Sequence, residues 1–146
     1  MSTAWLRTIL TAAACAAVVT FAMPSSAEMV QMKADLKGSN EVPPNDSKGG
    51  GSVELTYDTA SKKLSWQGTY TDLSGPATAA HFHSGEPGKN GGVAVPIFTG
   101  DKAQSPFSGS ATLTDEQAVA LMEGKFYVNI HTAAHKAGEI RGQVTK

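Results

Sequence analysis

The sequence predicts an all-β fold, a sandwich of about eight short strands with one short helix. Apolar and polar residues alternate with a period of two in several segments, which is typical of half-buried strands. Turns rich in glycine and proline separate these segments at the spacing expected of a β-sandwich. Only one segment has a helical pattern, and we see no internal repeat.

The first half of the chain predicts three strands. Residues 29–37 alternate apolar and polar side chains, which predicts a half-buried strand. The glycines and prolines of residues 38–51 predict a loop, because they cannot sustain a hydrogen-bonded ladder. Residues 52–58 and 63–71 are predicted to form a hairpin across the turn at 58–62.

The second half predicts the remaining strands, again bounded by turn residues. These strands are expected at residues 77–83, 93–98, 105–113, 125–132 and 138–145. Pro96 favours an edge position or a bulge for its strand, because proline cannot donate to a ladder. The glycine-rich turn of residues 84–92 does not open a helix and lacks a phosphate-loop ending, so we expect it to shape a wall near His83.

A single helix is predicted at residues 115–123. Thr114 precedes it and Gln117 stands at its third position, which together form a capping box. Gly124 is placed to end the helix.

The N-terminal segment predicts export. Arg7 is the only charge in the first 27 residues, and the apolar run 9–23 precedes a proline and small residues, as in a secretory signal peptide. We therefore expect a signal peptide at residues 1–27, a mature domain at 28–146, and a periplasmic or secreted protein. A membrane anchor would need a longer apolar run, and a lipoprotein signal at Cys15 would need a large aliphatic residue three positions earlier.

Charge and cysteine content narrow the function classes. Without Arg7 the mature chain has 11 basic against 13 acidic residues. This balance predicts binding neither to nucleic acid nor, after signal cleavage, to a membrane. Cys15 is the only cysteine and leaves with the signal. Any metal site in the mature domain must therefore use nitrogen or oxygen ligands.

The histidines carry the strongest functional signal. His81 and His83 alternate with Phe82 on one predicted strand, so both rings point away from the core. His131 takes the corresponding position on a second strand, opposite its apolar face. His135, the fourth histidine of the chain, follows just beyond that strand.

These rings predict a metal site with His81, His83 and His131 as ligands and His135 as a possible fourth. Imidazole suits copper and zinc, and the Irving–Williams order makes copper the first expectation and zinc the second. Three nitrogens would leave one position open for another ligand. The alternative is a structural polar ladder in which each ring bonds to a backbone carbonyl.

Three nearby residues are candidates to support the site. Glu139 and Arg141 share one face of the last strand and are expected to flank His131. Glu139 would accept a hydrogen bond from a histidine, and Arg141 would attract an anion to an open metal. The plainer alternative, which we favour, is a cross-strand Glu–Arg pair. Tyr127 would gate the site or pack beside it.

Three motifs together identify a family resemblance. They are NEVPP at residues 40–44, AHFHSGEPGKNGGVAVPIF at 80–98, and the stretch 113–144 that ends in GEIRGQV. In order and spacing they resemble the CHRD domain, named after chordin and also found singly in secreted bacterial proteins. The resemblance covers roughly residues 30–145 and implies a β-sandwich of immunoglobulin-like shape. One departure is Lys136, where the family usually has proline.

A second resemblance concerns architecture alone. Copper/zinc superoxide dismutases are also Greek-key β-sandwiches, and they use a His-x-His strand with a further histidine from a distant strand. Three functions therefore stay open: an exported metal-binding domain, a copper-dependent superoxide dismutase-like redox enzyme, and a metal-free protein-interaction module whose partner the sequence does not name. Fold likeness by itself does not establish an activity.

Overall fold

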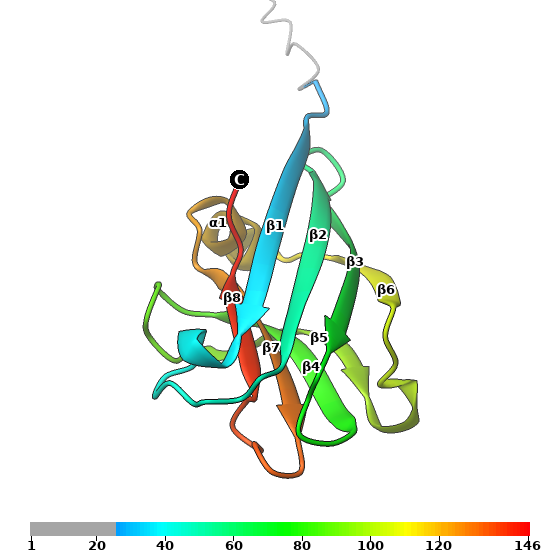
Figure 1. The fold of residues 1–146 in the computed structure, drawn as a ribbon. Helices are drawn as coiled ribbons and strands as arrows, with labels where there is room; N and C mark the ends of the chain where they lie inside the picture. The colour runs from blue at the N-terminus through cyan, green and yellow to red at the C-terminus, as the bar shows by residue number, and fades with distance from the viewer. Residues whose placement is uncertain (1–25) are drawn as a thin grey trace, which may run out of the picture.

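The computed structural model describes residues 26–146, which form one antiparallel sheet with a short helix at its end (Figure 1). The strands are β1 (Met29–Lys37), β2 (Gly50–Asp58), β3 (Lys63–Thr71), β4 (Ala77–Ser84), β5 (Gly92–Thr99), β6 (Phe107–Thr112), β7 (Phe126–Thr132) and β8 (Ile140–Gln143). The predicted signal peptide lies almost wholly outside the described residues. Within them, no helix is long and apolar enough to cross a bilayer.

The sheet runs in the order β5-β4-β7-β8-β1-β2-β3-β6 and curls until it is nearly closed. Its two edges approach each other, because the ring of Phe98 on β5 lies 5.4 Å from that of Phe107 on β6. Across the interior, Trp66 on β3 meets Phe82 on β4 edge to face at 5.1 Å. The predicted all-β fold of about eight strands is therefore confirmed.

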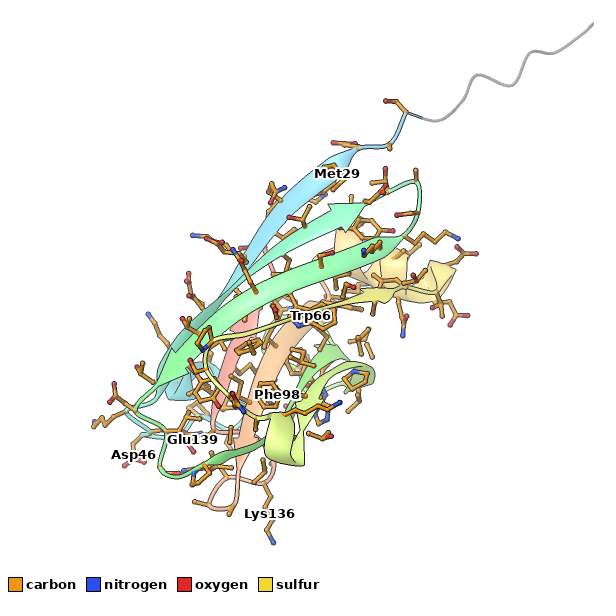
Figure 2. All side chains as sticks on the ribbon, turned by 90° about the vertical axis from the view of Figure 1, so that its right-hand side faces the viewer. Met29, Asp46, Trp66, Phe98, Lys136 and Glu139 are labelled. Carbon is orange, nitrogen blue, oxygen red and sulfur yellow. The ribbon has the colours of Figure 1, made fainter. Side chains whose placement is uncertain are left out.

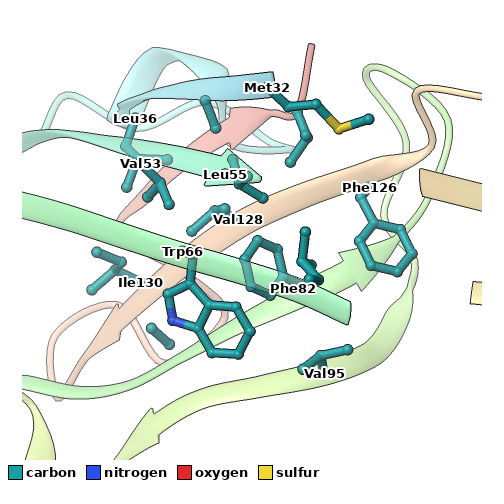
Figure 3. Close-up of a cluster of buried hydrophobic side chains, with 14 of the residues drawn as sticks. Met32, Leu36, Val53, Leu55, Trp66, Phe82, Val95, Phe126, Val128 and Ile130 are labelled. Atoms are coloured by element: carbon teal, nitrogen blue, oxygen red, sulfur yellow. The ribbon is translucent and has the colours of Figure 1, made fainter. Parts of the chain in front are cut away.

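The core fills the space between the two halves of this curled sheet (Figure 3). Alternate residues of each strand point inward, as the period-two pattern predicts. Phe82, Val128 and Ile130 are all fully buried there. The inward direction of Phe82 fixes the direction of its neighbours, because His81 and His83 must then point to the opposite face.

The helix α1 spans Asp115–Met122, one residue shorter than predicted. Its capping box is present: the backbone N–H of Gln117 donates to Thr114 Oγ1, and the backbone N–H of Thr114 donates to Gln117 Oε1. Leu121 anchors the helix in the core. Gln117 also donates to the carbonyl of Ala94, which ties the helix to β5.

The edge strand β5 contains Pro96, as predicted, and its pairing with β4 is irregular. Register shifts fall between Ala80 and His81 and between Phe82 and His83. β-Bulges of this kind re-aim side chains and are frequent beside functional sites. The irregular segment of β4 is therefore the one that presents both histidines.

The outer face of β7 is not open to solvent, although the sequence pattern predicts only its inner face as core. All seven residues of β7 are buried. The loops that follow β1 and β4 meet over this face, where the side-chain amide of Asn90 donates to the carbonyl of Val42. Asp46 and Lys136, from the loops after β1 and β7, lie with Glu139 at the end of the domain away from Met29 (Figure 2). Polar side chains are therefore buried between the outer face of β7 and the loops that cover it.

Candidate metal centre

Three histidines converge on the outer face of β4 and β7, where they are half-buried. His81 and His83 come from β4 and His131 from β7, and one ring nitrogen of each lies within 4.8 Å of the other two. The closest pair is His81 Nδ1 and His131 Nε2, at 3.2 Å. The structure therefore brings together three of the four histidines that the sequence proposes as ligands.

Backbone carbonyls fix the proton positions on two of these rings. His83 Nδ1 lies 3.0 Å from the carbonyl oxygen of Gly91, and His131 Nδ1 lies 3.0 Å from that of Lys136. A carbonyl oxygen can only accept, so each Nδ1 donates its proton and each Nε2 keeps a lone pair. His83 Nε2 is buried and has no hydrogen-bond partner among residues 26–146.

Burial also keeps the three rings uncharged. It lowers the pKa of His81, His83 and His131, because a charged imidazolium is poorly solvated there. For His81 the two neighbouring histidines lower the pKa further, and for His131 the bond to the Lys136 carbonyl partly opposes the shift. At neutral pH the rings thus present the neutral form that metals bind.

The geometry of the closest pair suits a metal ion. Two imidazole nitrogens each about 2.0 Å from a tetrahedral ion lie about 3.3 Å apart. The observed 3.2 Å between His81 Nδ1 and His131 Nε2 agrees with this separation. When no ion is bound, His131 Nε2 can only accept, so His81 Nδ1 must donate to it. Binding a metal would therefore move the proton of His81 to its Nε2.

A stack of three groups holds His83 in place. The ring of Tyr127 lies parallel to that of His83, with centroids 4.9 Å apart. The guanidinium carbon of Arg141 lies 3.5 Å from the centroid of the Tyr127 ring. Tyr127 therefore packs against the ring of His83. Its hydroxyl also accepts from the backbone N–H of Gly91, whose carbonyl fixes the His83 proton.

The guanidinium of Arg141 is engaged in hydrogen bonds within the domain, which does not support its expected role of attracting an anion to the metal. Its guanidinium donates to Asn90 Oδ1 at 3.0 Å and to the carbonyl of Lys89 at 2.6 Å, and the residue is 2% exposed. Arg141 thus ties the turn of residues 84–92 to the sheet. This turn supplies the Gly91 carbonyl, which confirms that it forms a wall beside His83.

Glu139 contacts neither a histidine nor Arg141 in the described part of the chain. Its carboxylate accepts hydrogen bonds from Ser47 Oγ, Ser74 N, Ser74 Oγ and Thr132 Oγ1. The two expectations for Glu139, a bond to a histidine and a cross-strand pair with Arg141, are both wrong. Glu139 precedes β8, outside regular pairing, and its side chain turns toward the hydroxyl groups.

His135 lies apart from the three converging nitrogens. Its backbone holds the turn after β7, where its carbonyl accepts from the N–H groups of Thr132 and Gly138. Its side chain lines a neighbouring cavity. The expectation that His135 is a fourth ligand is therefore not supported by the geometry.

Sequence reasoning missed two buried polar residues beside the centre. Asn129 lies between Tyr127 and His131 on β7 and is 4% exposed, and Glu41 in the loop after β1 is 6% exposed. The amide of Asn129 donates to Glu41 Oε2 at 3.4 Å. Burial raises the pKa of Glu41 to about 7, against the opposing charge of Arg141. The only signal in the sequence is the place of Glu41 within NEVPP, which we interpreted as a structural loop.

Together these features define a small all-β domain with a half-buried three-histidine centre that could hold a metal ion. The chain belongs to the CHRD domain family, whose profile matches residues 32–144. No curated protein and no solved structure matches the chain in the corresponding searches. The family match confirms the resemblance carried by the sequence motifs.

Proposed function

We propose that this CHRD domain is exported and binds a single transition-metal ion through His81, His83 and His131. The observation that carries the proposal is the convergence of one nitrogen from each of the three rings, while the second nitrogen of His83 and of His131 faces a backbone carbonyl. Metal-binding histidines nearly always donate their second ring N–H in this way, which orients the ring and sets its tautomer. The alternative, a structural ladder in which each ring bonds to a backbone carbonyl, gives no reason for one nitrogen of each ring to lie within 4.8 Å of the other two.

Copper is the ion that the donor set favours, and zinc is second. The three ligands are imidazoles, and the Irving–Williams order places Cu²⁺ above the other divalent ions at such nitrogen sites. The signal peptide expected at residues 1–27 would place the domain in the periplasm or outside the cell. The domain would bind, carry or buffer the ion there.

The test is a titration of the mature protein with Cu²⁺, in which the visible absorption spectrum is recorded at each addition. We expect one ion per chain and a d–d absorption band. Both should be lost in His81→Ala and kept in His135→Ala, a matched control because His135 lies outside the converging set. Equal loss in both variants, or no saturable binding by the parent protein, would refute the proposal. Competition with Zn²⁺ measures the preference between the two metals.

A copper-dependent, superoxide dismutase-like activity is the second candidate. Three nitrogens leave one coordination position open, an arrangement typical of reactive sites rather than structural ones. Consumption of superoxide by the copper-loaded protein, absent in His81→Ala, would support an enzyme. A loaded protein without such activity would be a carrier. A protein that binds no metal would leave the interaction module as the remaining function.

A further inference from the structure

The ligands of the histidine centre carry no negative charge. One nitrogen of each of His81, His83 and His131 converges there, and no carboxylate among residues 26–146 belongs to the converging group. An imidazole that binds a metal through one nitrogen and keeps a proton on the other is a neutral ligand. An ion bound by these three rings therefore keeps its full charge, unlike an ion bound by carboxylates or thiolates.

A guanidinium lies behind one of the three rings. The guanidinium carbon of Arg141 is 3.5 Å from the centre of the Tyr127 ring, and the Tyr127 ring is stacked on that of His83 at 4.9 Å. Arg141 is 2% exposed, so solvent screens its charge only weakly. The charge acts on the centre, because Arg141 is one of the groups that lower the pKa of His83.

The acidic side chains of this region do not cancel the charge of Arg141 below pH 7. The carboxylate of Glu139 is surrounded by hydroxyl groups and contacts neither a histidine nor Arg141. Glu41 interacts with Arg141, but burial raises the pKa of Glu41 to about 7, so at pH 6 it is mostly neutral. The cavity beside His83 is also lined by Lys136, which is exposed and positive.

The geometry of the centre does not suit a square-planar ion. Two nitrogens in neighbouring positions of a square plane, each about 2.0 Å from the ion, lie about 2.8 Å apart, whereas a trigonal or tetrahedral ion separates them by about 3.3–3.5 Å. His81 Nδ1 and His131 Nε2 are 3.2 Å apart. Cu²⁺ prefers tetragonal ligand sets, but a closed-shell ion such as Cu⁺ has no preference of this kind.

We infer that the centre binds copper as Cu⁺ in preference to Cu²⁺, and that the charge of Arg141 contributes to this preference. Both effects act in the same direction, since the ring geometry disfavours Cu²⁺ and a nearby positive charge repels the divalent ion more strongly than the monovalent one. The inference rests on the proposed function, because it specifies the oxidation state of the ion at the same three histidines. Arg141 touches no metal ligand directly and acts through Tyr127 and His83.

The test measures the dissociation constants of both copper ions on the mature protein at pH 6. Bicinchoninate competes for Cu⁺ in the presence of ascorbate and the absence of oxygen, and nitrilotriacetate competes for Cu²⁺. The midpoint potential of the bound copper gives the ratio of the two constants independently, because a potential above that of aqueous copper means that Cu⁺ is bound more tightly. We expect Cu⁺ to bind at least about tenfold more tightly than Cu²⁺.

Variants of Arg141 separate its charge from its packing. Arg141→Gln should reduce the preference for Cu⁺ about tenfold, the effect of one positive charge roughly 10 Å away at an effective dielectric constant of about 20. Arg141→Lys keeps the charge and should keep most of the preference. Lys63→Gln is the matched control, because it removes an exposed positive charge from β3, which faces β4 across the interior. This control should leave the preference unchanged.

The outcomes distinguish the inference from the proposed function. Binding of neither ion would refute the proposed function itself. Binding of Cu²⁺ as tightly as Cu⁺, or more tightly, would overturn the inference and leave the proposed metal centre intact. An equal preference in the parent protein and Arg141→Gln, or an equal loss in Arg141→Gln and Arg141→Lys, would overturn the role of the Arg141 charge. The comparison of the two ions on the parent protein is decisive even if neither Arg141 variant folds.

Discussion

Two buried carboxylates in this domain have opposite environments. Glu139 is 0% exposed and accepts four hydrogen bonds, from Ser47, Thr132 and both the N–H and hydroxyl of Ser74. Glu41 is 6% exposed and has one oxygen without any partner among residues 26–146. Burial raises the pKa of both groups, but the donors around Glu139 outweigh it and lower that pKa to about 2, whereas the pKa of Glu41 rises to about 7.

The difference shows that burial alone does not determine the role of a charged group. Glu139 connects the loops after β1 and β3 to the end of β7, and its donors stabilise the anion. Glu41 has one weak donor, from Asn129, and lies on the wall of an open cavity. The first carboxylate contributes stability to the fold. The second reduces stability in the ionised form, because one of its oxygens has no hydrogen-bond donor among residues 26–146.

The largest effect is expected from Glu139→Gln. The glutamine side chain has no negative charge, and its NH₂ group faces hydroxyl groups that donate to the carboxylate in the parent protein. We therefore expect the free energy of unfolding to fall by about 3 kcal/mol at pH 7. Chemical denaturation measures this change. Glu54→Gln is the matched control, because Glu54 is exposed and accepts a single bond from Gln67. A cost no greater than that of the control would show that the four bonds do not stabilise Glu139.

The same carboxylate predicts acid sensitivity. Its folded pKa of about 2 lies below the ordinary value of 4.5. Its contribution to stability is therefore complete above pH 4.5 and is lost as the pH falls toward 2. In Glu139→Gln the difference from the parent protein should shrink over this range. A difference that stays constant with pH would exclude the carboxylate charge as its source.

An effect of similar size but opposite sign is expected from Glu41→Gln in the metal-free protein. The folded pKa of about 7 lies above the ordinary 4.5, so ionised Glu41 lowers stability as the pH rises from 4.5 through 7. The variant should match the parent at pH 4 and exceed its free energy of unfolding by about 3 kcal/mol at pH 8.5. Urea denaturation across this pH range measures the difference. A variant less stable than the parent at pH 8.5 would show that Glu41 has donors that compensate its charge.

The smallest effect is expected from Tyr127→Phe. It removes the hydroxyl that accepts from the N–H of Gly91, at a cost of about 1 kcal/mol. The stack on His83 stays, so one copper ion per chain should still bind. Denaturation and copper titration together check both expectations. Loss of copper binding would show that the Tyr127 hydroxyl, rather than the ring, orients the Gly91 carbonyl toward His83.

Much of the scaffold and part of the site were predictable from local sequence. Alternation around Phe82 indicated the outward direction of His81 and His83, and the same pattern placed His131 on the matching face of β7. The error over Glu139 has a physical reason. β8 begins one residue later, at Ile140, so the alternation of that strand does not govern the Glu139 side chain. The covered outer face of β7 was also not predictable, because a local pattern does not show which loops fold over a strand.

The sequence by itself determined the strands, the single capped helix, the family and the common face of three histidines, because each depends on neighbouring residues or on a contiguous motif. Only the tertiary structure decided which groups surround that face. Glu41 meets Asn129 across 88 positions of the chain. The carbonyls of Gly91 and Lys136 reach their histidines because β4 pairs with β7 and the adjoining loops fold back over both strands. Contacts of this kind depend on strand order and loop path, which no local pattern encodes.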